Sequence, residues 1–138
     1  MVGLITVTHG DFGRELAKSA ELIVGESKYV TSIGLHLGDT LETLTKEIVD
    51  AVRKMHEQTN EGVLILIDLF GGTTSNAAAQ ATYQLEAEVP IYCLTGLNLP
   101  MYLEIIMQRE FSTLSELVKI GKEVGEKSVV SLHEKIGI

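Results

Sequence analysis

The chain has 138 residues, is 45% hydrophobic and 22% charged, and carries a formal net charge of −8. This length suits one domain that buries roughly two-thirds of its unfolded surface. The acidic net charge argues against binding to nucleic acid or to an anionic membrane surface, because a protein that binds either one needs a basic face. The single cysteine, Cys93, excludes an internal disulfide. With no signal peptide and no apolar run of about 20 residues, we expect a cytoplasmic protein without membrane insertion.

Short apolar segments alternate with longer amphipathic segments along the whole chain. Strands are predicted at residues 2–8, 29–33, 63–68 and 91–95, and helices at residues 11–24, 41–58, 74–85, 99–108 and from 114 onward. This alternation predicts right-handed βαβ units and a mostly parallel sheet. We therefore expect a single doubly wound α/β domain over residues 1–138, with helices on both faces of the sheet.

Two spacings of the capping-box type mark helix starts. Asp39 is followed three residues later by Glu42, and Thr113 three residues later by Glu116. Near the end of the chain, residues 129–131 form a short β-branched run that we interpret as a possible final strand.

Unusual residues follow three of the predicted strands. His9 ends the first strand, Asp68 ends the third, and Gly96-Leu97-Asn98 follows the fourth. Ligands of doubly wound folds bind beyond the carboxyl ends of the strands, where the strand order reverses. In a 2-1-3-4 order, His9 and Asp68 would meet there, and residues 96–98 would close a third side.

A glycine-rich turn follows Asp68 and leads into a helix. Gly71 and Gly72 are succeeded by Thr73 and Thr74, so backbone N–H groups and hydroxyls gather at a helix N-terminus. Such a turn is typical of an anion site. We therefore predict that Gly71, Gly72, Thr73 and Thr74 bind a phosphoryl group.

A histidine paired with a carboxylate suggests nucleophilic chemistry. Histidine is mostly neutral at pH 7 and can act as a base or a nucleophile. A carboxylate on one ring nitrogen fixes the tautomer and leaves the other nitrogen free. Together with the anion-binding turn, His9 and Asp68 predict a phosphohistidine site, since phosphoryl transfer depends mostly on positioning and charge stabilisation.

Other chemistries find less support. The turn lacks the Gly-Lys pair of a Walker loop, and no G-x-S-x-G elbow supports a hydrolase triad of Ser75, His9 and Asp68. No metal-ligand spacing is present, and we expect neither a metal nor a cofactor. We interpret the remaining histidines as structural or solvated: His36, His56 and His133.

Three motifs together resemble a known family. Thr8–Gly10 (THG), Asp68–Ala78 (DLFGGTTSNAA) and Gly96–Met101 (GLNLPM) are similar, in this order and spacing, to the enzyme IIA component of the mannose family of the bacterial phosphoenolpyruvate-dependent sugar phosphotransferase system (PTS). The resemblance covers essentially the whole chain. One departure is visible, because Thr74 stands where the family turn often has proline.

The resemblance implies a phosphotransferase component with a phosphohistidine intermediate. His9 would accept a phosphoryl group from HPr and pass it to enzyme IIB, which serves sugar uptake through the membrane IIC/IID complex. Asp68 would bond the histidine, and the glycine-rich turn would receive the phosphoryl group. The family also implies a homodimer, in which a C-terminal antiparallel strand such as residues 129–131 joins the partner's sheet.

Three alternatives remain open at this point. A phosphoryl-donor subunit of a dihydroxyacetone kinase system shares the fold and the first-strand histidine. A receiver-like regulatory domain would be modified on Asp68 instead, although Thr8-His9-Gly10 stands where its acidic pair is expected. A regulator that only binds partners would be modified on neither residue.

Overall fold

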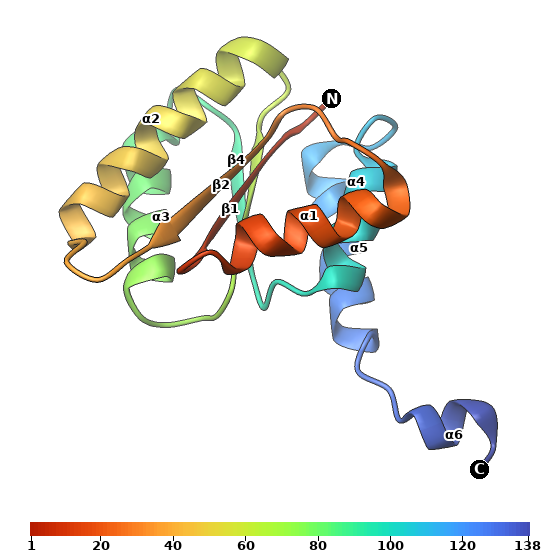
Figure 1. Cartoon of the computed structure of the whole chain (residues 1–138). Coiled ribbons are helices and arrows are strands. Elements are labelled where there is room, and N and C mark those ends of the chain that lie inside the picture. The colour runs from red at the N-terminus through yellow and green to blue at the C-terminus, as the bar shows by residue number, and fades with distance from the viewer.

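Four parallel strands form the central sheet in the order β2-β1-β3-β4 (Figure 1). The computed structural model describes all residues, 1–138. The strands are β1 (Gly3–His9), β2 (Val30–Leu35), β3 (Val63–Ile67) and β4 (Ile91–Thr95). The helices are α1 (Phe12–Val24), α2 (Leu41–Thr59), α3 (Thr73–Leu85), α4 (Leu99–Gln108), α5 (Leu114–Lys127) and α6 (Leu132–Ile136). The predicted strand order and parallel pairing are confirmed.

Helices cover both faces of the sheet, as Figure 1 shows. Helices α2 and α3 pack on one face, and α1, α4 and α5 pack on the other. Strand β3 lies between both layers, so all five of its side chains are buried. This double burial explains why the strand reads as an unbroken apolar run instead of an alternating one.

The helix starts confirm one capping box and correct the other. Thr113 and Glu116 exchange the two expected hydrogen bonds at the start of α5. At α2 the N-cap is Thr40, which pairs with Thr43, so the predicted box at Asp39 is wrong by one residue. Asp39 accepts a hydrogen bond from a loop N–H group instead. Adjacent Asp and Thr residues are both good N-caps, so spacing alone did not choose between them.

The predicted strand at residues 129–131 is not formed within this chain. The segment links α5 to the short helix α6, which projects away from the body of the domain (Figure 1). Val129, Val130, Leu132 and Ile136 are all exposed. A strand needs a neighbouring strand for its backbone hydrogen bonds, and this segment pairs with no strand of the chain. None of the helices is both long and apolar enough to cross a membrane.

A buried arginine binds the backbone at the end of the sheet where β1 and β2 begin. Arg109, at the end of α4, is 3% exposed. Its guanidinium donates to the backbone carbonyls of Val2, Lys28 and Tyr29, which lie where β1 and β2 begin. Burial lowers the pKa of Arg109, and the nearby Tyr102 and Glu110 offset this effect only in part. Arg109 thus holds the end of the sheet that lies opposite His9.

Candidate functional site

His9 is the last residue of β1 and lies at the carboxyl edge of the sheet. Its Cα pairs with that of Leu35 on β2, and its side chain is 52% exposed. Gly10 follows with a φ of +53° and donates its N–H to the Leu35 carbonyl at 2.8 Å. This left-handed conformation turns the chain out of the sheet and into α1, which leaves the imidazole at the surface.

Asp68 directly follows β3, the strand beside β1, and the structure brings it to His9. The Asp68 Oδ2 atom lies 2.7 Å from His9 Nδ1 and accepts the His9 backbone N–H at 2.8 Å. The other oxygen, Oδ1, accepts the N–H of Leu69 at 3.0 Å and the hydroxyl of Thr74 at 3.1 Å. The carboxylate is only 12% exposed. Its four acceptor positions are therefore all used by the protein.

These contacts favour the ionised form of Asp68. Burial raises the pKa of the carboxyl, but the hydrogen bonds from the His9 backbone, the His9 ring and Thr74 outweigh it, and the pKa is lowered overall. An ionised carboxylate can only accept hydrogen bonds. The proton of the short contact therefore resides on His9 Nδ1, and the lone pair of His9 Nε2 is left available.

The glycine-rich turn between β3 and α3 stands beside this pair. Gly71 and Gly72 have φ values of +86° and +88°, which favour glycine. The Ser75 hydroxyl oxygen accepts the Gly71 N–H at 2.9 Å and so closes the turn. The four N–H groups of residues 72–75, at the start of α3, have no acceptor within the chain. Free N–H groups of this kind at a helix N-terminus are suited to binding an anion.

The two threonines of the turn differ in their surroundings. Thr73 is half-buried and its hydroxyl makes no hydrogen bond within the chain. Thr74 is fully buried, and its hydroxyl is directed to Asp68. Ser75, which the sequence suggested only as an unlikely nucleophile, braces the turn. Its place in the first turn of a helix was the available signal, since serine there often bonds to nearby backbone.

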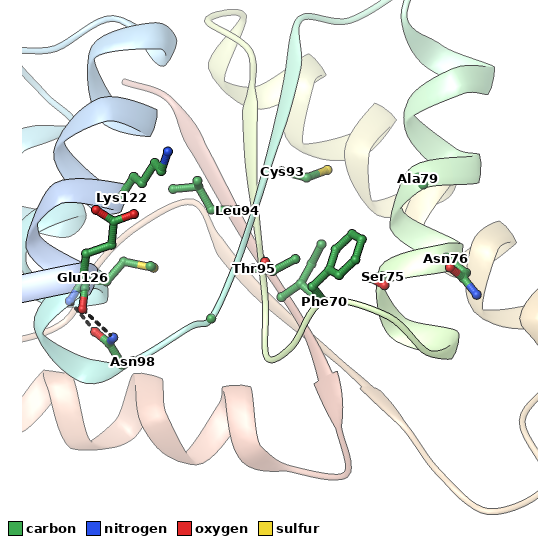
Figure 2. A pocket seen from close by; sticks show the side chains of 14 residues that line it. Phe70, Ser75, Asn76, Ala79, Cys93, Leu94, Thr95, Asn98, Lys122 and Glu126 are labelled. Carbon is green, nitrogen blue, oxygen red and sulfur yellow. Dashed lines mark hydrogen bonds between the residues drawn. The ribbon is translucent and has the colours of Figure 1, made fainter. Parts of the chain in front are cut away.

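No hydrogen bond joins residues 96–98 to the side chain of His9 or Asp68. Asn98 is the N-cap of α4, where its side-chain oxygen accepts the Met101 N–H at 3.0 Å. Its amide nitrogen donates to the Gly125 carbonyl of α5 at 3.3 Å (Figure 2). Strand β4 is separated from β1 by β3. Asn98 therefore anchors α4 to α5, and it lines a cavity that Phe70 of the glycine-rich turn and Ser75 at the start of α3 also line.

The other histidines form no hydrogen bond with the His9–Asp68 pair. His36 follows β2, is exposed, and lies 3.4 Å from Asp11. His56 lies in the last turn of α2, and His133 lies in α6. No three His, Cys, Asp or Glu side chains gather closely enough to hold a metal ion. Burial raises the pKa of the Cys93 thiol.

The fold and this site define a class of protein: a doubly wound α/β domain that displays a carboxylate-bound imidazole at its topological switch point. Comparison with known proteins narrows the class. A sequence profile of the family described as "PTS system fructose IIA component" matches residues 3–121. The chain belongs to this family of PTS EIIA components.

Individual relatives agree with the profile. The fructose-specific EIIA component of Bacillus subtilis (strain 168) is 32% identical over 139 residues, covering 99% of this chain and 92% of that protein. The mannose-specific EIIAB component of Escherichia coli (strain K12) is 33% identical over 135 residues, and the match covers 97% of this chain. The chain spans only 40% of the length of that relative.

Solved structures share the fold over nearly the whole chain. EIIA from Streptococcus agalactiae has a TM-score of 0.86 at 27% identity, covering 97% of this chain and 99% of that one. The mannose/sorbose-specific IIA subunit from Enterococcus faecalis has a TM-score of 0.83 at 26% identity, covering 95% and 94%. The comparisons do not favour the dihydroxyacetone kinase or receiver-like alternatives.

Proposed function

We propose that the chain is a phosphoryl carrier of the PTS and that His9 is the residue that is phosphorylated. The observation that carries this proposal is the 2.7 Å contact between His9 Nδ1 and Asp68, on an imidazole that is 52% exposed. A side chain that served only the fold would not need a buried, fully bonded carboxylate and an exposed ring. We place the phosphoryl group on Nε2, because Nδ1 is occupied by its proton and by Asp68.

The transfer needs few groups. The Nε2 lone pair attacks phosphorus, the bond from phosphorus to the donor's nitrogen breaks, and the electron pair of that bond remains on the donor. The His9 ring gains positive character as the new bond forms, and the adjacent Asp68 carboxylate stabilises it. The proton stays on Nδ1 throughout, so the step requires no metal and no external base.

The start of α3 is suited to the oxygens of the phosphoryl group. Gly71 and Gly72 let the backbone approach closely, and the N–H groups of residues 72–75 have no acceptor in the chain. The α3 dipole adds roughly half a positive charge at this end. We assign the hydroxyl of Thr73 to the same role, because it makes no other hydrogen bond.

The family assigns partners to this chemistry. We propose HPr as the donor and enzyme IIB as the acceptor, with the phosphoryl group finally reaching a sugar through the membrane IIC/IID complex. Residues 1–138 would form one IIA unit that works in the cytoplasm, where these partners meet. Exposed apolar side chains near the carboxyl edge are consistent with protein docking there: Phe12, Leu37, Leu69 and Phe70. Met101, at the start of α4, is buried and does not contribute to this surface.

We also propose a homodimer formed through β4. Strand β4 has a neighbour on one side only, and beside it lies a cavity of about 700 Å³ between α3 and α5 (Figure 2). Phe70, Thr95 and Lys122 are among the residues that line it. The exposed apolar segment at residues 129–131 would supply an antiparallel strand to the partner's β4. This pairing would cover both the free edge of β4 and the apolar side chains of the segment.

The carrier role is tested by phosphorus NMR after incubation with phosphoenolpyruvate, enzyme I and HPr. A resonance of the Nε2-phosphorylated imidazole, absent in His9→Gln, is the expected result. A resonance of the Nδ1 isomer, or of an aspartyl phosphate at Asp68, would contradict the assignment. His36→Gln, which removes the exposed histidine at the end of β2, is the matched control and should be phosphorylated normally.

A further inference from the structure

We infer that Thr74 is a positioning residue that acts through Asp68 and does not touch the phosphoryl group. Its side chain is 0% exposed, and its hydroxyl donates to Asp68 Oδ1 at 3.1 Å. No other hydrogen bond from this hydroxyl is formed. The inference rests on the proposed carrier function of His9, and it replaces the role that the sequence suggested for Thr74.

The hydrogen bond from Thr74 differs from the others on the carboxylate in its origin. Oδ2 accepts both hydrogen bonds from His9, whereas Oδ1 accepts those from the Leu69 N–H and the Thr74 hydroxyl. The N–H of Leu69 belongs to the residue next to Asp68 and moves with it. Thr74 belongs to α3, a separate rigid element. Its hydroxyl therefore fixes the rotation of the carboxylate plane against the helix, and so directs Oδ2 at His9 Nδ1.

The same hydrogen bond also limits how strongly Asp68 attracts a proton. A donor on Oδ1 stabilises the ionised carboxylate and contributes to the lowered pKa of Asp68. His9 is the only titratable side chain that bonds to Asp68, and no lysine or arginine forms an ion pair with it. The number of neutral donors on the carboxylate therefore decides how far the Nδ1 proton is drawn toward it.

This proton matters when His9 gives up its phosphoryl group. The bond between phosphorus and Nε2 breaks, and its electron pair stays on Nε2. The imidazole accepts that pair more readily when the Nδ1 proton remains fully on the ring. By weakening the carboxylate as a base, Thr74 favours release to the acceptor over retention on His9. Thr74 thus sets the balance between storing the phosphoryl group and passing it on.

The test compares Thr74→Val, which keeps the shape and loses the hydroxyl, with Thr74→Ser, which keeps the hydroxyl. Thr73→Val is the control, because it removes a neighbouring hydroxyl that does not contact Asp68. The first measurement is the pH titration of the Asp68 carboxyl carbon by NMR in the unphosphorylated protein. We expect a higher midpoint in Thr74→Val and an unchanged midpoint in the serine variant and in the control.

The second measurement is the rate at which the phosphorylated protein passes its phosphoryl group to enzyme IIB. We expect Thr74→Val to be slower by roughly fivefold, the effect of one ordinary hydrogen bond, and Thr74→Ser to restore the rate. If Thr74→Val does not fold, Thr74→Ala removes the same hydroxyl and suits a helix. A valine or alanine variant with the wild-type midpoint and release rate would overturn the inference.

The two measurements separate this inference from the proposed function. The titration of Asp68 requires no phosphoryl group. It therefore reports how the Thr74 hydrogen bond affects the titration midpoint of Asp68 even if His9 is never phosphorylated. A wild-type protein that cannot be phosphorylated would overturn the carrier function and, with it, the role of Thr74 in release. A phosphorylated wild type with an unchanged Asp68 midpoint in Thr74→Val would overturn only the role of Thr74.

Discussion

Replacing Asp68 by asparagine removes the charge of the site and keeps its shape. The carboxylate accepts four hydrogen bonds, two from His9, one from Leu69 and one from Thr74. An asparagine amide has one oxygen, so its NH₂ group must face donors on the other side. If the oxygen faces His9, the Leu69 N–H loses its acceptor. The variant should therefore lose about 1–3 kcal/mol of unfolding free energy.

The same change should slow phosphorylation of His9. The lost charge-assisted hydrogen bond contributes about 1.5–3 kcal/mol, which corresponds to roughly 10- to 150-fold in rate. The assay is the initial rate of transfer from phosphorylated HPr, followed by intact mass. Asp39→Asn is the matched control, because Asp39 also accepts a backbone N–H at the end of a strand but does not contact His9. Equal rates for Asp68→Asn and the control would refute the role of the charge.

The pH dependence of stability gives an independent check on Asp68. Its pKa is lowered in the folded protein, so its stabilising contribution is fully present above the ordinary carboxyl value of about 3.9. The contribution is lost as the pH falls through the lower folded-state pKa. The stability difference between wild type and Asp68→Asn should be constant near neutral pH and shrink below about pH 4. A difference that grows on acidification would contradict this sign.

Three further variants test other parts of the structure. A Cβ atom added at Gly72 would meet no atom within 4 Å, but the backbone there has a φ of +88° and a ψ of −178°, which suit only glycine. Urea unfolding of Gly72→Ala should therefore show a loss of about 1–3 kcal/mol in unfolding free energy, and phosphorylation should slow. Arg109→Met removes a donor from three backbone carbonyls, of which only that of Tyr29 is known to keep another, the Leu4 N–H. It should cost about 2–4 kcal/mol in the same assay without slowing phosphorylation of the folded protein. Val130→Glu should convert the proposed dimer to a monomer by sedimentation, whereas Leu22→Glu, also exposed but on α1, should not. Unchanged stability for either of the first two, or an unchanged dimer for the third, would count against the corresponding argument.

The sequence predicted the parts of the molecule that depend on chain-wide pattern. Alternating strands and helices predicted the layers, and the apolar run at residues 63–68 predicted the strand β3, which the structure buries on both faces. Parallel topology then placed His9 and Asp68 at one edge, because the carboxyl ends of neighbouring parallel strands coincide. Their proximity followed from strand order and required no knowledge of side-chain conformation.

Features that depend on competition between neighbouring polar groups could not be predicted in this way. Thr40 and Asp39 are both suitable N-caps, and only the backbone geometry of the folded chain selects Thr40. The hydroxyls of Thr73 and Thr74 are chemically identical, yet burial directs only that of Thr74 to Asp68. The segment at residues 129–131 shows the other limit, because the strand predicted there has no neighbouring strand within one chain.

The central claim is tested most directly by the intact mass of the protein after incubation with phosphoenolpyruvate, enzyme I and HPr. Wild type should gain one acid-labile phosphoryl group, whereas His9→Ala should gain none. Unmodified wild type in a reaction where HPr itself is phosphorylated would contradict the account. A phosphoryl group of equal extent on His9→Ala would also contradict it, because the modified residue would then lie elsewhere in the chain.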